Sequence, residues 1–358
     1  MKLYHLSDLH FGVSPPSLGE DAHQKIVLRK LQEVIERAER EGVRFVVLAG
    51  DTFDSNALPS ALVKKLLGLL ARYQRVNFIL LPGGGKKDQQ GIRGHDAYTK
   101  DSLYRRLEVS SYFEQPHLFL LTPENPVVLF KEEGVAFYGG FFDFPRAEPQ
   151  TEARFHVAVM HGAFGEREDF GEIPLTQERS LFYDYLALGH YHRHRRLTEK
   201  AAYSGAFVQF EFLPYQEGTS GYLEVDLSSS PPKLRYHVFE DAPRFLYHRV
   251  LNAGDLEALK QLDFNFCNVK IVSYLKKFKE DIRALQAKWG QKVQVSDEVE
   301  IPEEEASLIL GPLEEILAEK VPEEFRQEVE EFLLYGLLVS HQKGHLEKFL
   351  KARFFPEG

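Results

Sequence analysis

Short apolar runs alternate with amphipathic segments over the first half of the chain. The runs at 2–6, 44–48 and 76–81 are typical of buried β-strands. Between the first two runs, residues 25–38 repeat apolar side chains at helical spacing, at Val27, Leu31, Val34, Ile35 and Ala38. A second helix is expected near 58–73. This alternation predicts a layered α/β domain with helices covering a sheet.

Two later apolar runs, at 155–162 and 184–192, again end in polar loops that carry histidines. From Ala201 to about Glu240 the pattern changes to short strands, which are split by the turn-forming run SSSPP at 228–232. We therefore expect a first domain over residues 1–240.

A small α+β unit is expected over residues 241–300. Its pattern is β-α-β-α-β, with elements expected at 245–250, 255–262, 268–274, 279–289 and 292–295. Residues 301–358 form the third predicted segment, with two amphipathic helices. It is acidic: between 301 and 350, twelve Glu oppose only four Lys and Arg.

Composition limits the class of protein. The chain has 358 residues, 43% of them hydrophobic and 27% charged, which is typical of folded globular domains. No apolar run approaches the roughly 20 residues of a membrane helix. The single Cys267 excludes an intrachain disulfide, and we expect a cytoplasmic protein. The net charge of −10 comes mainly from the C-terminal segment, whereas residues 86–106 form a modest basic patch.

Polar side chains follow five of the predicted strands, where metal and substrate ligands collect in α/β sheets. They are Asp8 and His10, Asp51 and Asp54, His95 and Asp96, His161, and His190 and His192. Each motif alone is more often an ordinary turn or a set of exposed surface residues without a function. Five strand ends with carboxylates or imidazoles together favour a site for Mn²⁺, Fe²⁺ or Zn²⁺.

The order D-x-H, G-D-x-x-D, H-D, H-G and G-H-x-H resembles the calcineurin-like metallophosphoesterases. Two longer stretches, HDAYTKDSLYRR at 95–106 and AYSGAFVQFEF at 202–212, are similar to the SbcD-type DNA repair exonucleases. In that family the nuclease subunit works with an SbcC-type ATPase. The resemblance covers the first domain well and the unit after it only loosely.

The resemblance implies a four-layer α/β/β/α sandwich, a capping role for the small α+β unit, and a two-metal site that hydrolyses DNA phosphodiesters. The expected ions are Mn²⁺, with Mg²⁺, Fe²⁺ or Zn²⁺ as alternatives. One ion would be held by Asp8, His10 and His192, and the other by His161 and His190. Asp51 would bridge both ions. His95 would be the catalytic imidazole and Asp54 the acid that orients it, while Asp96 would brace the loop.

The sequence departs from the family pattern between Gly83 and His95. If residues 84–93 are an insertion, Gly94 stands where the family has an Asn ligand, and the second ion is expected to bind more weakly. A water or a loop residue (Asp88, Gln89 or Gln90) would then complete the site. Without an insertion, Gly84, Gly85 and Lys86 would replace the Asn-His-Asp motif, and the catalytic imidazole would be absent.

The partners follow from the same resemblance. DNA would contact Lys86, Lys87 and Arg93 of the inserted loop through its phosphates. Alternatively, that loop would hinder the binding of DNA. The chain has no GxxxxGK[ST] motif, so any ATP dependence would come from the ATPase subunit. The C-terminal helices would either dock that subunit or pack on the body. A homodimer is expected through the helices near 58–73 and 101–112.

Two other functions stay open at this point. The metal motifs would also suit a general phosphodiesterase for small substrates. A structural subunit with a weakened metal site would account for the missing Asn.

Overall fold

The computed structural model describes residues 1–18, 21–84, 86–88, 91–165, 173–175, 180–212, 219–250, 252–274 and 276–295. The chain divides into two compact units, each with its own hydrophobic core. The first consists of residues 1–210 and 218–243, and the second of residues 211–217 and 244–358.

The first unit contains a six-stranded sheet in the order β16-β15-β1-β2-β3-β6. The bounds of these strands, in the same order, are Lys233–Val238, Gly221–Asp226, Lys2–Leu6, Phe45–Ala49, Asn77–Leu81 and Leu118–Leu120. Strands β1, β2, β3 and β6 run parallel, whereas β15 and β16 add an antiparallel edge. The three predicted N-terminal strands are confirmed to within one residue at each end.

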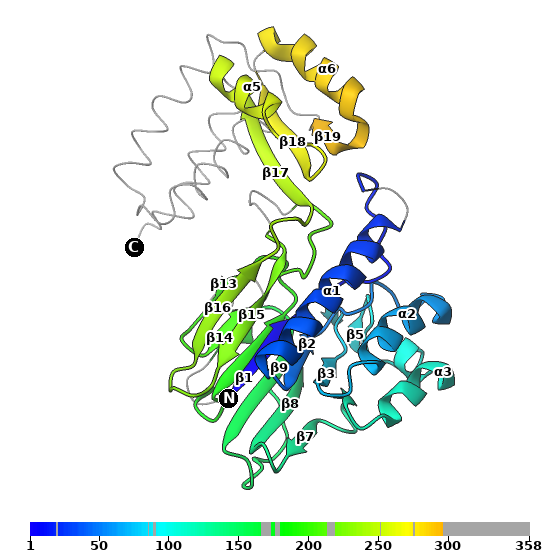
Figure 1. The fold of residues 1–358 in the computed structure, drawn as a ribbon, viewed down its shortest axis with the longest axis vertical. Coiled ribbons are helices and arrows are strands. Elements are labelled where there is room, and N and C mark those ends of the chain that lie inside the picture. The colour runs from blue at the N-terminus through cyan, green and yellow to red at the C-terminus, as the bar shows by residue number, and fades with distance from the viewer. Residues whose placement is uncertain are drawn as a thin grey trace. The chain divides into compact units, whose positions relative to one another are not determined.

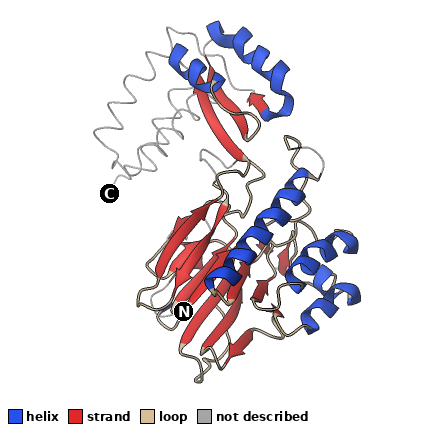
Figure 2. Cartoon of the chain, viewed as in Figure 1, coloured by secondary structure: helices blue, strands red, loops and turns tan. Residues whose placement is uncertain are grey.

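Helices cover one face of this sheet (Figures 1 and 2). They are α1 (Ala22–Glu41), α2 (Ser60–Ala71) and the short α3 (Leu107–Ser110). All five apolar positions that predicted the first helix are buried in the core beneath it. Alternation along β2 explains the two-sided burial: Val46 and Leu48 face the helices, and Phe45 and Val47 face the opposite side.

A second six-stranded sheet packs against that opposite side, in the order β13-β14-β12-β9-β8-β7. Its strands, in the same order, are Arg195–Arg196, Ala201–Tyr203, Tyr185–Gly189, Phe155–His161, Val135–Phe141 and Val127–Phe130. The core between the sheets combines Phe45 and Val47 with Phe137, Val157 and Val159. This arrangement confirms the predicted layered α/β sandwich.

Shorter elements complete the first unit. The outer face of the second sheet is covered by Phe144, Phe164 and Tyr183 from segments between its strands. A two-stranded pair joins β10 (Phe164–Gly165) to β11 (Ile173–Pro174).

The two sheets approach each other closely at the carboxyl ends of β2 and β12. A methyl group built on Gly189 would lie 1.8 Å from the carbonyl oxygen of Ala49, so only glycine fits there. A methyl group on Gly50 would lie 2.0 Å from Nδ1 of His161. These glycines bring the loops that follow strands of both sheets into one place.

The second unit follows the predicted order of elements: β17 (Arg244–Val250), α5 (Ala253–Lys260), β18 (Cys267–Tyr274), α6 (Lys279–Trp289) and β19 (Val293–Val295). The three strands form a parallel sheet, as β-α-β crossovers require. The apolar core of the unit includes Leu246, Leu259, Val269 and Ile282.

The predicted acidic segment 301–358 lies outside the described residues. Within the described part of the chain, the helices are too short or too polar to span a membrane.

Replacing Gly189 with Ala should lower the free energy of unfolding by about 2 kcal/mol or more, because the new methyl group would overlap the Ala49 carbonyl. The matched control is Gly68→Ala in the last turns of α2, where a new methyl group would lie 3.7 Å from the hydroxyl of Tyr112, an ordinary contact distance. That variant should gain about 0.5–1 kcal/mol. Urea denaturation of both variants measures the difference, and equal stabilities would contradict the close approach.

Candidate metal centre

The loops after β1 and β2 run side by side and position the first site residues. The backbone N–H of Asp8 donates to the carbonyl of Gly50 at 3.1 Å, and that of His10 donates to the carbonyl of Asp51 at 2.9 Å. Thus the parallel pairing of the strands continues into the loops. Asp8, His10 and Asp51 are held close together as a result.

Five site residues adopt a positive φ, which L side chains rarely do. These are Asp8 (50°), His10 (42°), Asp51 (47°), His95 (38°) and His190 (117°). Such conformations cost about 1–3 kcal/mol each and persist where the surrounding structure enforces them. Their concentration at these strand ends is typical of a functional site.

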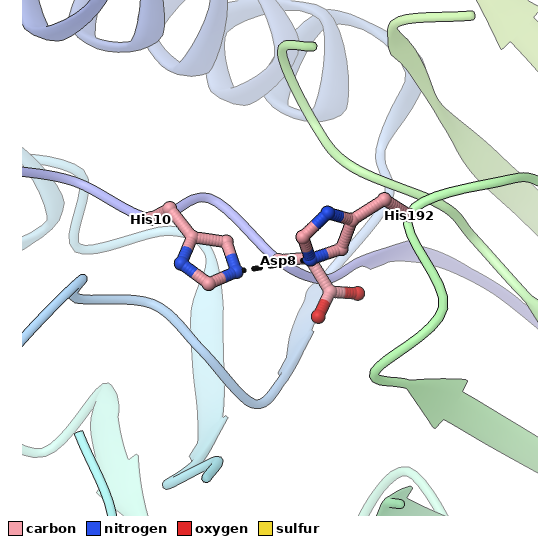
Figure 3. Close-up of side chains that lie close together, drawn as sticks. All are labelled: Asp8, His10 and His192. Atoms are coloured by element: carbon pink, nitrogen blue, oxygen red, sulfur yellow. Dashed lines mark hydrogen bonds between the residues drawn. The ribbon is translucent and has the colours of Figure 1, made fainter. Parts of the chain in front are cut away.

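Asp8, His10 and His192 form one group of ligand-type side chains, and their atoms lie within 4.8 Å of one another (Figure 3). Nε2 of His10 lies 3.1 Å from Nε2 of His192. Both carboxylate oxygens of Asp8 accept the backbone N–H of His190, at 3.0 and 3.1 Å. The structure thus brings together the three residues expected around one ion.

The buried carboxylate of Asp51 is the point on which three imidazoles converge. Its Oδ2 lies 3.3 Å from Nε2 of His161, 3.6 Å from Nε2 of His10 and 3.8 Å from Nε2 of His95. Ligands that share an ion at about 2.1 Å are separated by similar distances. Asp8, Asp51 and His161 form a second group that could hold a metal ion.

The chemistry of His161 fits a cation. Its ring is fully buried, and Nδ1 lies 3.0 Å from the carbonyl of Ala49, which can only accept. Nδ1 therefore carries the proton in this bond. Its Nε2 has no hydrogen-bond partner among the described residues and faces Asp51. Carboxylates and imidazoles without thiolates suit Mn²⁺, Fe²⁺ or Zn²⁺, so the residues present fit a metal site.

The buried groups of this centre have shifted pKa values in the absence of metal. Burial raises the pKa of the Asp8 carboxyl. Burial opposes ionisation of Asp51 as well, but the nearby imidazoles, His161 foremost, together outweigh it and hold the pKa of that carboxyl well below its usual range. The attraction to Asp51 likewise overcomes burial and raises the pKa of His161. Asp51 therefore stays ionised, as a bridging ligand must.

His190 differs from the other site imidazoles in its position and in its pKa. Its ring centre lies 5.4 Å from that of His161. Its side chain belongs to neither of the groups above, nor to the third ligand-type group among the described residues, which consists of His10, Asp54 and His95. Burial, followed by the charge of His161, lowers the pKa of His190 to about 4. The ring is therefore neutral near pH 7, the state in which an imidazole binds metal.

His95 lies in the site, on the loop that follows the interruption. Its ring packs edge-on against His10, with ring centres 4.5 Å apart, and its side chain is 34% exposed. Nδ1 of His95 lies 3.2 Å from the backbone carbonyl of Asp54 and 4.0 Å from its carboxylate. The carboxylate lies closer to Nδ1 of His10, at 3.1 Å. The backbone of Asp54, rather than the expected carboxylate, thus makes the hydrogen bond to His95.

The interrupted segment contains a small hairpin. Strands β4 (Lys86–Asp88) and β5 (Gly91–Arg93) pair antiparallel between Gly83 and Gly94. His95 lies in the site just beyond this hairpin. Gly94, at φ 87°, has no side chain to replace the missing amide. Gln89 and Gln90 lie outside the described residues, as do the side chains of Lys86, Lys87, Asp88 and Arg93.

Asp96 braces the loop that carries His95. Its carboxylate accepts hydrogen bonds from the backbone N–H groups of Phe53 (3.1 Å) and Gly83 (2.7 Å) and from the hydroxyl of Tyr104 (2.6 Å). Burial and then the charge of Asp51 raise the pKa of Asp96 to about 6, although these hydrogen bonds oppose the shift. The carboxylate thus links the loop after β3, the loop after β2 and the segment after His95.

Two supporting residues were missed in the sequence. Ser7 donates a hydrogen bond to the carboxylate of Asp8, and the side-chain amide of Gln209 donates to the carbonyl of His192 at 2.7 Å. Ser7 directly precedes the D-x-H motif and Gln209 lies within the stretch AYSGAFVQFEF, but neither residue type signals a supporting role by itself.

The calcineurin-like phosphoesterase family matches residues 1–194, which is more than half of the chain. The chain belongs to the calcineurin-like phosphoesterase family. Proteins of this family bind divalent metals, and the described ligand-type groups are candidate positions for such ions in this member.

One curated relative is the DNA double-strand break repair protein Mre11 of Aeropyrum pernix. It is 26% identical to this chain over 250 residues, which cover 64% of this chain and 59% of that protein. The chain therefore matches about three-fifths of the length of that relative.

Similar solved structures include the following two. Purple acid phosphatase PPD1 of yellow lupin (Lupinus luteus) has a TM-score of 0.38 and 11% identity, over 68% of this chain and 52% of that one. Vps29 of Entamoeba histolytica, complexed with Zn²⁺, has a TM-score of 0.30 and 14% identity, over 67% and 100% of the two chains.

Replacing Asp96 with Ala should lower the free energy of unfolding by about 3 kcal/mol or more, because three donors lose their acceptor in a buried place. Tyr104→Phe, which removes only one of these hydrogen bonds, should cost about 1 kcal/mol. Urea denaturation followed by circular dichroism gives both values. An Asp96→Ala variant no less stable than Tyr104→Phe would exclude the bracing role.

Proposed function

We propose that this chain is a Mn²⁺-dependent DNA nuclease that hydrolyses phosphodiester bonds with two metal ions. As an SbcD-type nuclease subunit, it would process DNA ends during repair. The proposal goes beyond the family, whose members include phosphoesterases of several kinds. It draws on the similarity to Mre11 and on the SbcD-like stretches at 95–106 and 202–212.

The observation that carries the proposal is the convergence on Asp51. Imidazoles from the loops after β1 and β5 and from the last residue of β9 direct Nε2 atoms at one buried carboxylate oxygen. A carboxylate suits a bridging position, since its negative charge offsets the repulsion between two cations.

The proposed ligands follow from these positions. Asp8, His10 and His192 would hold the first ion, and His161 and His190 the second. Asp51 would contact both. When bound, the two ions would activate the attacking water and stabilise the charge on the leaving oxygen.

His95 would act as the catalytic imidazole. The carbonyl of Asp54 can only accept a hydrogen bond, so Nδ1 of His95 carries a proton in that interaction. Nε2 is left to face the site, 3.8 Å from Asp51. As the bond between phosphorus and the sugar oxygen breaks, a proton on Nε2 would pass to that oxygen.

The second ion would bind more weakly than the first. Gly94 supplies no amide oxygen where the family pattern has an Asn, so a water or a residue of the inserted hairpin would have to complete that site. The position of His95 beside His10 and Asp51 favours the alignment with an insertion over the one in which the imidazole is lost.

The proposed partners are DNA, an SbcC-type ATPase and a second copy of the chain, in the cytoplasm. Lys86, Lys87 and Arg93 of the inserted hairpin are candidates for phosphate contacts. Arg106 is not, because its guanidinium donates to the carbonyls of Asn56 and Leu58.

A cleavage assay tests the proposed function. Linear duplex DNA, single-stranded DNA and a chromogenic phosphodiester are each incubated with Mn²⁺ and the wild-type chain or His95→Ala. We expect the wild type to cleave DNA, and the variant to be slower by about 10²–10⁴-fold through loss of the proton donor.

The matched control is His237→Ala. This histidine lies on β16, where its Nε2 is 2.9 Å from the carboxylate of Glu224, and its loss should leave cleavage unchanged. Cleavage of the small ester alone would indicate a general phosphodiesterase. No cleavage of any substrate would indicate a structural subunit, and either result would contradict the proposal.

A further inference from the structure

Strand β8 ends beside the candidate centre with an aromatic residue in an unusual conformation. Phe142, the residue directly after β8, is half-buried and has a φ of 49°. Among the described non-glycine residues, positive φ otherwise occurs only at the five site residues and at Asp21, the residue before helix α1. Glycine would adopt this conformation at much lower cost, so the contacts of the phenylalanine must compensate for its strain.

The contacts of Phe142 lie around the H-G motif at the end of β9. Its backbone N–H donates to the carbonyl of His161 at 2.9 Å. A methyl group built on Gly162 would lie 3.1 Å from a ring carbon of Phe142, so Gly162 leaves the space that this ring occupies. The ring centre of Phe142 lies 6.0 Å from that of His161 and 5.7 Å from that of His190. Phe142 thus touches the two imidazoles expected around the second ion.

The ring of His190 depends on packing for its orientation. Its backbone N–H donates to the carboxylate of Asp8, whereas its ring makes no hydrogen bond or ion pair within the described part of the chain. The rings of the other four site histidines each lie within hydrogen-bond distance of another group. The His190 ring instead packs against those of Phe142, His161 and Tyr191.

Phe142 differs from the other two rings that touch His190. His161 is itself an expected ligand of the same ion, and Tyr191 is the next residue along the same loop. Phe142 comes from a separate strand end, and its backbone is bonded to the end of β9. It therefore fixes the His190 ring relative to the sheet rather than moving with it. A ligand side chain keeps a precise geometry when the packing around it locks its rotamer.

We infer that Phe142 is a positioning residue that holds the imidazole of His190 in place for the second metal ion. The inference rests on the proposed two-metal centre and adds to it a residue that lies outside every ligand motif. Phe142 would act through packing alone, because its ring has no group that binds a cation in the plane of the site. Since Gly94 supplies no ligand to the second ion, that ion would depend strongly on how well His190 is oriented.

Isothermal titration calorimetry with Mn²⁺ on the full chain tests the inference. Phe142→Ala should weaken the second, weaker Mn²⁺ site by about 10-fold and leave the tighter site within about 2-fold of the wild type, because only the support of His190 is lost. Phe142→Leu keeps apolar bulk against His190 and should lose less affinity than Phe142→Ala. Phe142→Gly suits the positive φ, so it should fold and still bind the second ion more weakly.

Phe239→Ala is the matched control for the loss of a half-buried phenylalanine. The ring of Phe239 packs on those of Phe207 and Tyr222 rather than on a site imidazole. Its removal should lower stability in urea denaturation and leave both Mn²⁺ affinities unchanged. A Phe239→Ala variant that loses the second ion as Phe142→Ala does would overturn the inference, since general destabilisation would then explain both results.

NMR relaxation of the His190 ring in the metal-free chain tests the contact independently of metal binding. The ring should be rigid on the ps–ns timescale in the wild type and in Phe239→Ala, and mobile in Phe142→Ala. A Phe142→Ala variant that binds both ions with wild-type affinity, or whose His190 ring stays as rigid as in the wild type, would overturn the inference and leave the metal centre intact. A wild type that binds fewer than two Mn²⁺ ions would instead overturn the two-metal proposal, even if the ring measurement shows the expected contact.

Discussion

Strands β2 and β12 meet at their carboxyl ends without a side chain between them. Gly189 leaves room for the carbonyl of Ala49, and Gly50 leaves room for the ring of His161. Nδ1 of His161 then lies 3.0 Å from that same carbonyl, so a residue of the second sheet is bonded to a strand of the first. Asp51 follows directly and lies where loops from both sheets meet. The whole candidate centre depends on this close contact, because no single sheet supplies all of its ligands.

The centre concentrates energetically unfavourable features, namely buried charges and strained backbone conformations, that a folded protein usually avoids. Asp8 and Asp51 are both buried, and burial penalises ionised carboxylates. Five of the site residues also have a positive φ. The surrounding sandwich, with its two large apolar cores, offsets these costs. A divalent cation would reduce the repulsion between the carboxylates and would bind Nε2 of His161 on the side that faces Asp51. The same buried charges that destabilise the metal-free protein would thus bind the ion.

Local sequence patterns predicted the helices and strands better than they predicted which strands pair with each other. Helical spacing at Val27 to Ala38 and the short apolar runs are local signals, and they gave strands and helices that the structure confirms. Strands β7 and β8 were not predicted, because pairing between distant strands leaves no local pattern. The division into two sheets was expected only from the family resemblance. The clustering of Asp8, His10 and His192 could be predicted from strand ends and family motifs. The pairing of Asp54 with His10 could not, since it depends on side-chain positions within about 1 Å.

The central claim is that Asp51 lies between two divalent ions, and crystals soaked in Mn²⁺ test it most directly. Anomalous scattering should show two peaks about 3.5–4 Å apart on either side of the Asp51 carboxylate. One peak should lie beside His10 and His192, and the other, with lower occupancy, beside His161. Absence of any peak next to Asp51, or a position of His10 far from His192, would contradict the account.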